Sequence, residues 1–284
     1  MPGYKLGRLP GQIPAGLRDL TYYAAGPLPK APASVAVPDV ADWDILGNQT
    51  YGDCGPAALE HGFMSAAADT GEHEQFPDDQ QCVDYYLAYT GGQDSGVVLS
   101  QYLAYVRQKG YYGHTVAAYA PVTVHDVPSL RFAVDAYDFA YCGITVTQAM
   151  MDAFDAGEPW TTATLEGPVL GGHCVPAVGY TDEYLTIVTW GKTQQVAWPA
   201  WHGMSEEAWA VIAGEEVSAG ADGHGINLAA LQADLSRLAV PAAPAPISAP
   251  AGLLEEAAEL IRAVAASEHK DITELLAFLA SHGL

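Results

Sequence analysis

The chain has 284 residues, half of them hydrophobic, which is enough apolar material for one large globular domain with a small appendage. Its 34 acidic and 11 basic residues give a formal charge of −23, which argues against nucleic acid and anionic membrane as partners. No stretch of about 18 uninterrupted apolar residues occurs, and the N-terminus lacks the apolar segment of a secretion signal. We therefore expect a soluble, cytoplasmic protein.

The first 41 residues predict an extended N-terminal arm, because they are rich in Pro and Gly and carry few helix or strand signals. Residues 42–239 follow as the main domain. In its first half, apolar residues at helical spacing predict helices over residues 54–68, 78–89 and 97–109.

The second half of the main domain predicts a sheet. Short β-branched or aromatic runs, punctuated by Gly and Pro, occupy residues 114–124, 141–147, 174–181 and 184–191. Helices are expected between them at residues 127–137 and 148–154, and residues 205–212 form an amphipathic stretch that closes the domain. Helices followed by a sheet predict an α+β domain of two lobes.

The C-terminal end changes character at a Pro- and Ala-rich linker, residues 240–252. Residues 253–284 carry two amphipathic segments, predicted as a helical hairpin. Two such helices bury little on their own, so we expect the hairpin to dock on the body, on another copy of the chain or on a protein partner.

The stretch around Cys54 is the first candidate for chemistry. Cys54 stands where the first predicted helix begins, and the unpaired N–H groups there lower the pKa of a thiol. Gly52 and Gly55 would let a substrate backbone approach, and the Gln49 side-chain amide could serve an oxyanion. Asp53 opposes this, because its charge would raise the thiol pKa unless the carboxylate caps the helix. A lone cysteine before an apolar helix is more often structural, so a second motif must decide.

His173 supplies that second motif. It follows two glycines at the start of a predicted strand, and residues 184–191 form the next strand, whose far end would return beside it.

These motifs, Gln49-x4-Cys54 at a helix start, Gly172-His173-x4-Val178-Gly-Tyr and Thr189-Trp-Gly, resemble the papain-like cysteine peptidases over roughly residues 42–215. The sequence is also similar to double-glycine processing peptidases and to papain-like proteins of actinobacterial phages. His173 follows Cys54 more closely than the about 130–150 residues of papain and the cathepsins. The resemblance implies a helical lobe with a nucleophile helix, an antiparallel sheet lobe and a peptide or protein substrate.

The resemblance also implies roles for particular residues. Cys54 would attack a carbonyl carbon, His173 would act as base, and Gln49 with the Cys54 N–H would stabilise the oxyanion. Papain spaces its glutamine one residue further from the cysteine. Gly96 and Trp190, with Gly52 and Gly55, would line the substrate cleft.

The third catalytic member departs from the family. Where papain has Asn and the processing peptidases Asp, this chain has Val188 or Thr189. Thr189 is the better candidate and Asp182 a second, but a hydroxyl cannot stabilise imidazolium as a carboxylate does.

Three functions therefore remain open. The first is a cysteine-dependent hydrolase of peptide or related amide bonds. The second is a catalytically silent papain-like module, a binding or virion-associated structural protein that uses residues 253–284 for interaction. The third is acyl transfer or deamidation by the same dyad.

The remaining candidates are interpreted as structural. Cys82, Cys142 and Cys174 are expected in the core, and the absence of a CxxC pair favours a reducing compartment. No HExxH or His–Cys ligand pattern occurs, so we expect neither a metal nor another cofactor.

Overall fold

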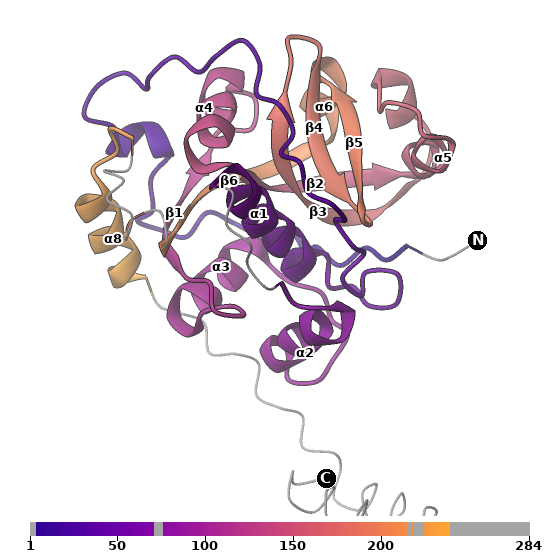
Figure 1. Cartoon of the computed structure of the whole chain (residues 1–284), viewed down its shortest axis with the longest axis horizontal. Coiled ribbons are helices and arrows are strands. Elements are labelled where there is room, and N and C mark those ends of the chain that lie inside the picture. Colours follow the sequence, from indigo (N-terminus) through magenta and orange to yellow (C-terminus); the bar gives the residue numbers. More distant parts are fainter. Residues whose placement is uncertain (1–3, 71–75, 215–216, 218–223, 239–284) are drawn as a thin grey trace, which may run out of the picture. The chain divides into compact units, whose positions relative to one another are not determined.

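The computed structural model describes residues 4–70, 76–214, 217 and 224–238 (Figure 1). The chain divides into two compact units, Met1–Pro244 and Ala245–Leu284. The described residues all belong to the first unit. The predicted linker at 240–252 and helical hairpin at 253–284 lie outside the described residues.

Helices dominate the first half of the described unit and strands the second. The helices are η1 (Leu20–Tyr23), α1 (Cys54–Thr70), α2 (Asp79–Thr90), α3 (Leu99–Lys109), α4 (Val127–Tyr137), α5 (Gln148–Ala156), η2 (Thr162–Leu165), α6 (Trp198–Met204) and α8 (Leu228–Arg237). The strands are β1 (Val116–Val122), β2 (Ala140–Thr147), β3 (Val169–Tyr180), β4 (Tyr184–Thr189), β5 (Lys192–Ala197) and β6 (Ser205–Ala213). The predicted α+β class is confirmed.

The strands form one antiparallel sheet in the order β1-β6-β2-β3-β4-β5. Strand β3 is central to the site because it pairs with β2 on one side and with β4 on the other. Strands β3 and β4 are antiparallel, with Ala177 opposite Ile187, so β4 runs back toward the start of β3. The antiparallel partnership predicted for the strand after His173 is therefore confirmed.

Helix α1 is the buried centre of the unit. Every residue from 54 to 65 is buried, which is why the helix lacks a polar face of ordinary width. It packs on β3 and contacts α2, and Figure 1 shows it between the sheet and the pair α2 and α3. This packing fixes the start of α1 against the strand that carries His173.

Some elements have weaker sequence signals. The stretch at 205–212 is not a peripheral closure: as β6 it lies between β1 and β2 inside the sheet. Residues 208–213, which carry most of the β-strand signal, are buried, whereas the first three residues of β6 include two glutamates. The short α6 and β5 follow one another without a turn residue, and the sequence alone did not predict either.

The N-terminal arm lies along the folded unit. Val35 exchanges both backbone hydrogen bonds with Tyr180 at 2.9 Å, which adds a bridge to the end of β3. Nearer the N-terminus, Arg8 forms a parallel bridge with Val97, just before α3. The arm therefore contacts both the sheet, at the end of β3, and the segment that precedes α3.

Candidate active site

Cys54 occupies the first position of α1. The carbonyl of Asp53 accepts the N–H of Ala57 at 3.0 Å, so Asp53 caps the helix through its backbone. The first N–H groups of a helix have no partner within it and carry partial positive charge. The Cys54 thiol therefore lies at an electropositive helix end, and it is only 1% exposed.

His173 lies in β3 and is held from one side by Thr189. Its Nε2 is 2.8 Å from the Thr189 hydroxyl oxygen, and both side chains are buried. Its Nδ1 has no hydrogen-bond partner among the residues that the structure describes. One ring nitrogen is thus fixed and the other is left unused.

Trp190 covers the His173 ring. The two rings stack with centroids 4.5 Å apart and planes inclined by 20°. Trp190 and Gly191 form the two-residue turn between β4 and β5, with φ of 46° and 76°. A two-residue hairpin turn with positive φ at both central positions suits Gly191, whereas Trp190 adopts a conformation that side chains disfavour.

Cys54 and His173 share one small cavity of about 10 Å³. This volume holds at most one water molecule. The cavity is lined by Ile45, Asn48, Cys54, Ala57, Ala58, His61, His173, Cys174, Val188, Thr189 and Trp190. The two candidate catalytic residues therefore line the same small space.

The N-terminal arm lies beside Cys54 and the strand that carries His173. The Arg8 N–H donates to Gly172 O at 3.1 Å, beside His173. The Val97 N–H donates to Gly7 O and the Leu9 N–H donates to Val97 O, each at 2.8 Å. The arm thus runs between Val97 and the His173 strand and is hydrogen-bonded to both.

The arm fits closely because glycines face it. A Cβ on Gly7 would lie 1.7 Å from Gly52 O, and one on Gly96 would lie 2.3 Å from Gly7 O. Gly96 also has φ of 75°, which a side chain disfavours. Gly52 and Gly96, both expected to line a substrate cleft, contact the arm.

The fold of the described residues resembles that of known proteases. The structure is similar to xylellain, a cysteine protease from Xylella fastidiosa, with a TM-score of 0.57, 15% sequence identity, and coverage of 74% of this chain and 96% of that chain. The chain has the papain-like fold. No protein-family model and no curated protein matches the sequence.

Two further similar structures are proteases in precursor form. A ragweed pollen cysteine protease in its proform matches with a TM-score of 0.49 and 18% identity, over 71% of each chain. Procathepsin L 3 from the larval midgut of Tenebrio molitor matches with a TM-score of 0.48 and 14% identity, over 70% of this chain and 75% of that chain.

Burial keeps both candidate catalytic groups of the papain-like domain neutral. It raises the pKa of the Cys54 thiol to about 12, although the backbone groups of Cys174, Gly7 and Arg8 that interact with the sulfur oppose the shift. Burial also lowers the pKa of the His173 imidazole to about 3, with His61 adding to the shift. With the arm in place, the pair is thiol and neutral imidazole.

Asp53 is also kept neutral. It is fully buried, and burial raises its carboxyl pKa to about 8 against the opposing hydrogen bond from Asn48. Nearby Asp94 and Asp79 add to the shift. At neutral pH the group next to Cys54 is therefore mostly uncharged, which weakens its effect on the thiol.

Gln49 and Asn48 differ in whether they line the cavity of Cys54 and His173. The Gln49 amide donates to Asp79 on α2 at 3.0 Å, and Gln49 does not line the cavity. Asn48, one residue further from Cys54, does line it. Its amide donates to Tyr51 O at 3.0 Å and to Asp53 Oδ1 at 3.1 Å. The papain spacing of the amide to the cysteine was the signal that could have identified Asn48.

Of the other predicted residues, Cys174 lines the cavity, whereas Gly55, Asp182, Cys82 and Cys142 do not. Gly55 packs against Val97 and Tyr141, since a Cβ there would lie 2.3 Å from Val97 Cγ2. Asp182 pairs with Arg131 at 3.3 Å. The remaining cysteines, Cys82, Cys142 and Cys174, are buried free thiols, as expected for core residues.

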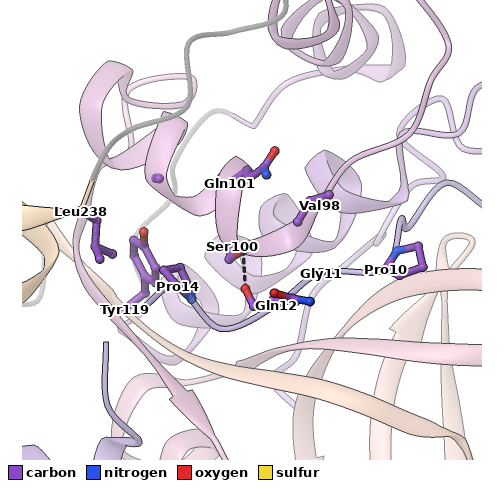
Figure 2. Close-up of a pocket in the computed structure, with 10 residues that line it drawn as sticks. Pro10, Gly11, Gln12, Pro14, Val98, Ser100, Gln101, Tyr119 and Leu238 are labelled. Atoms are coloured by element: carbon purple, nitrogen blue, oxygen red, sulfur yellow. Dashed lines mark hydrogen bonds between the residues drawn. The ribbon is translucent and has the colours of Figure 1, made fainter. Parts of the chain in front are cut away.

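A second hollow lies where the arm leaves the cleft. Figure 2 shows residues 10–14 of the arm passing α3, where the Ser100 hydroxyl donates to Gln12 O at 3.4 Å. The hollow has a volume of about 450 Å³, and Tyr119 and Leu238 close its far side. Because neither Cys54 nor His173 lines it, it is separate from the candidate active site.

Metal ligands are not grouped in the part of the chain that the structure describes: no three His, Cys, Asp or Glu side chains are placed to hold one ion. No helix in the described ranges has both the length and the apolar character needed to cross a membrane.

Proposed function

We propose that this chain is a cysteine peptidase of the papain-like fold, with Cys54 as nucleophile and His173 as base. The observation that supports it best is the shared cavity: Cys54 at the start of α1 and His173 on β3 line the same space. His173 has one nitrogen bound to Thr189 and the other unused.

The hydrogen bond from His173 to Thr189 indicates the path of the thiol proton during the reaction. When the proton of neutral His173 is on Nε2, the ring donates to the Thr189 hydroxyl oxygen, and Nδ1 keeps a lone pair. Nδ1 takes the thiol proton as sulfur attacks the substrate carbonyl, and later returns it to the leaving amine. Thr189 fixes the tautomer and the ring orientation, but it supplies no charge to stabilise imidazolium.

The oxyanion would form near the start of α1. The backbone N–H of Cys54 is one donor, since it belongs to the unpaired first turn. The second donor is a side-chain amide, and Asn48 is better placed than Gln49 because it lines the cavity. Asn48 would have to release its hydrogen bond to Tyr51 or Asp53 to serve it.

Catalysis requires the arm to leave. The cavity of about 10 Å³ has no room for a peptide, and Gly7 and Arg8 occupy the cleft. Release of the arm would hydrate Cys54 and His173, and so remove the burial that keeps both neutral. The folded chain as described is therefore an arm-bound, resting state.

The test is hydrolysis of a quenched fluorescent peptide library by full-length Gly7→Ala. In this variant the added Cβ would clash with Gly52, so the arm cannot bind in its wild-type position. We expect cleavage, abolished by adding Cys54→Ser. A well-folded Gly7→Ala protein with reactive Cys54 but no hydrolysis of any peptide would favour the silent binding module over the peptidase.

A further inference from the structure

The side chain of Arg8 fills a pocket of its own beside the candidate active site. It is only 4% exposed. Its Nη1 lies 2.5 Å from Glu206 Oε2, and its Nε lies 2.9 Å from Glu207 Oε1. Two carboxylates from β6 therefore hold one guanidinium from the arm, about 200 residues away in the chain.

The sheet makes room for this side chain with two glycines. Gly143 of β2 lies opposite Glu207 of β6, and a Cβ on Gly143 would be 2.5 Å from Arg8 Nε. A Cβ on Gly172 of β3 would be 3.2 Å from Arg8 Nη1. A larger residue at either position would clash with the guanidinium. The two glycines on these neighbouring strands therefore leave space for the Arg8 side chain.

Hydrogen bonds from neighbouring residues of the sheet position the Glu206 and Glu207 carboxylates beside the guanidinium. Glu207 Oε2 accepts the indole N–H of Trp209 at 2.9 Å, and Glu206 Oε1 accepts the hydroxyl of Thr145. Partial burial raises the pKa of Glu206, but the bonds from Thr145 and Arg8 outweigh it and leave the pKa lowered. Each carboxylate thus has one oxygen anchored by the sheet and the other directed at Arg8.

The pocket adjoins the reacting atoms through the backbone of the same residue. The Arg8 N–H binds Gly172 O, next to His173, and the backbone groups of Gly7 and Arg8 interact with the Cys54 sulfur. The residue whose side chain fills the pocket therefore has its main chain beside Cys54 and His173.

We propose that the pocket of Gly143, Gly172, Glu206 and Glu207 selects a basic side chain in the substrate, and that Arg8 fills it in the resting state. The inference rests on the proposed peptidase function. It names the substrate class: peptides with Arg or Lys at the position that Arg8 occupies. An aliphatic side chain there would leave Glu207 desolvated without a cation.

The first test keeps the arm in the full-length chain and measures how well it shields Cys54. Site-resolved alkylation by iodoacetamide, followed by mass spectrometry, reports arm release. We expect Arg8→Leu to raise the rate about tenfold or more, because each charge-assisted hydrogen bond is worth at least about one order of magnitude. Arg8→Lys should raise it less.

Matched variants isolate the pocket. Lys5→Leu makes the same change of charge in the same arm at an exposed side chain, and it should leave the rate unchanged. In a Glu207→Gln background, Arg8→Leu should have a smaller effect than in wild type. An Arg8→Leu rate equal to wild type, or equal effects of Arg8→Leu and Lys5→Leu, would overturn the proposal.

The second test extends recognition to a peptide in solution. Full-length Gly7→Ala is alkylated in the presence of a synthetic peptide of residues 4–12, or of the same peptide carrying Arg8→Leu. We expect the Arg peptide to protect Cys54 at about tenfold lower concentration, and Glu207→Gln to reduce that difference. Equal protection by the two peptides, or protection by neither, contradicts a basic pocket.

These readouts do not depend on turnover. Selective protection by the Arg peptide without hydrolysis of any peptide would keep the pocket and reject the peptidase. Hydrolysis without preference for basic residues would keep the peptidase and reject the pocket.

Discussion

Replacing Gly7 by Ala should expel the arm from the cleft. The added Cβ would lie 1.7 Å from Gly52 O and 2.3 Å from Gly52 C, both backbone atoms. Gly52 cannot yield easily, because its own N–H is bound to Asp94 Oδ1 at 2.8 Å. The arm must therefore move by more than about 1 Å to reach an ordinary contact distance.

The size of the effect follows from the bonds that such a shift breaks. The hydrogen bonds Arg8 N–H to Gly172 O, Val97 N–H to Gly7 O and Leu9 N–H to Val97 O are 2.8–3.1 Å long. At roughly 0.5–1.5 kcal/mol each, their loss weakens arm binding by about 1.5–4.5 kcal/mol. The population with an open cleft should therefore rise by roughly ten- to a thousandfold.

The assay is the rate of Cys54 alkylation by iodoacetamide, resolved by mass spectrometry from Cys82, Cys142 and Cys174. Gly26→Ala is the matched control, because a Cβ there meets nothing within 4 Å and the residue belongs to the same arm. We expect rapid alkylation of Gly7→Ala and a wild-type rate for Gly26→Ala. If Gly7→Ala keeps the wild-type melting temperature and the wild-type rate, the arm does not shield Cys54.

Two further variants test single contacts. Thr189→Ala leaves His173 Nε2 buried without its 2.8 Å partner, so stability should fall by about 1–3 kcal/mol in urea unfolding and kcat should fall more than KM rises, whereas Thr189→Ser should retain both; an unchanged kcat would remove Thr189 from the mechanism. Asp53→Asn tests the buried carboxyl, whose pKa of about 8 means that the folded chain keeps a proton which the unfolded chain releases near pH 4. Wild-type stability should therefore fall by this contribution as pH rises from about 4 to 8, and the fall should be smaller in Asp53→Asn; parallel pH profiles of the two proteins would show that Asp53 is not held neutral.

The sequence predicted those parts of the site that carry local signals. Cys54 starts a helix with a long apolar pattern, and Thr189 ends a strand at a Trp-Gly turn. These signals lie within a few residues of each side chain. The Thr189 contact with His173 then follows from the antiparallel pairing of β3 with β4.

The rest depends on contacts between distant segments. The Gln49 amide is drawn toward Asp79, 30 residues later in the chain, so the choice between Gln49 and Asn48 needed the position of α2. The Arg8 pocket joins residues 198 and 199 positions apart, with no periodic pattern in either segment. The position of β6 inside the sheet was hidden for the same reason, because its partners β1 and β2 lie far away in sequence.

The pH dependence of Cys54 alkylation in full-length Gly7→Ala, with and without His173→Ala, tests the central claim most directly. A thiolate–imidazolium pair predicts rapid reaction below pH 7, and His173→Ala should abolish that acidic limb. A Cys54 that stays unreactive in Gly7→Ala, or that titrates like an ordinary free thiol in both proteins, would contradict a thiolate–imidazolium pair and the peptidase function.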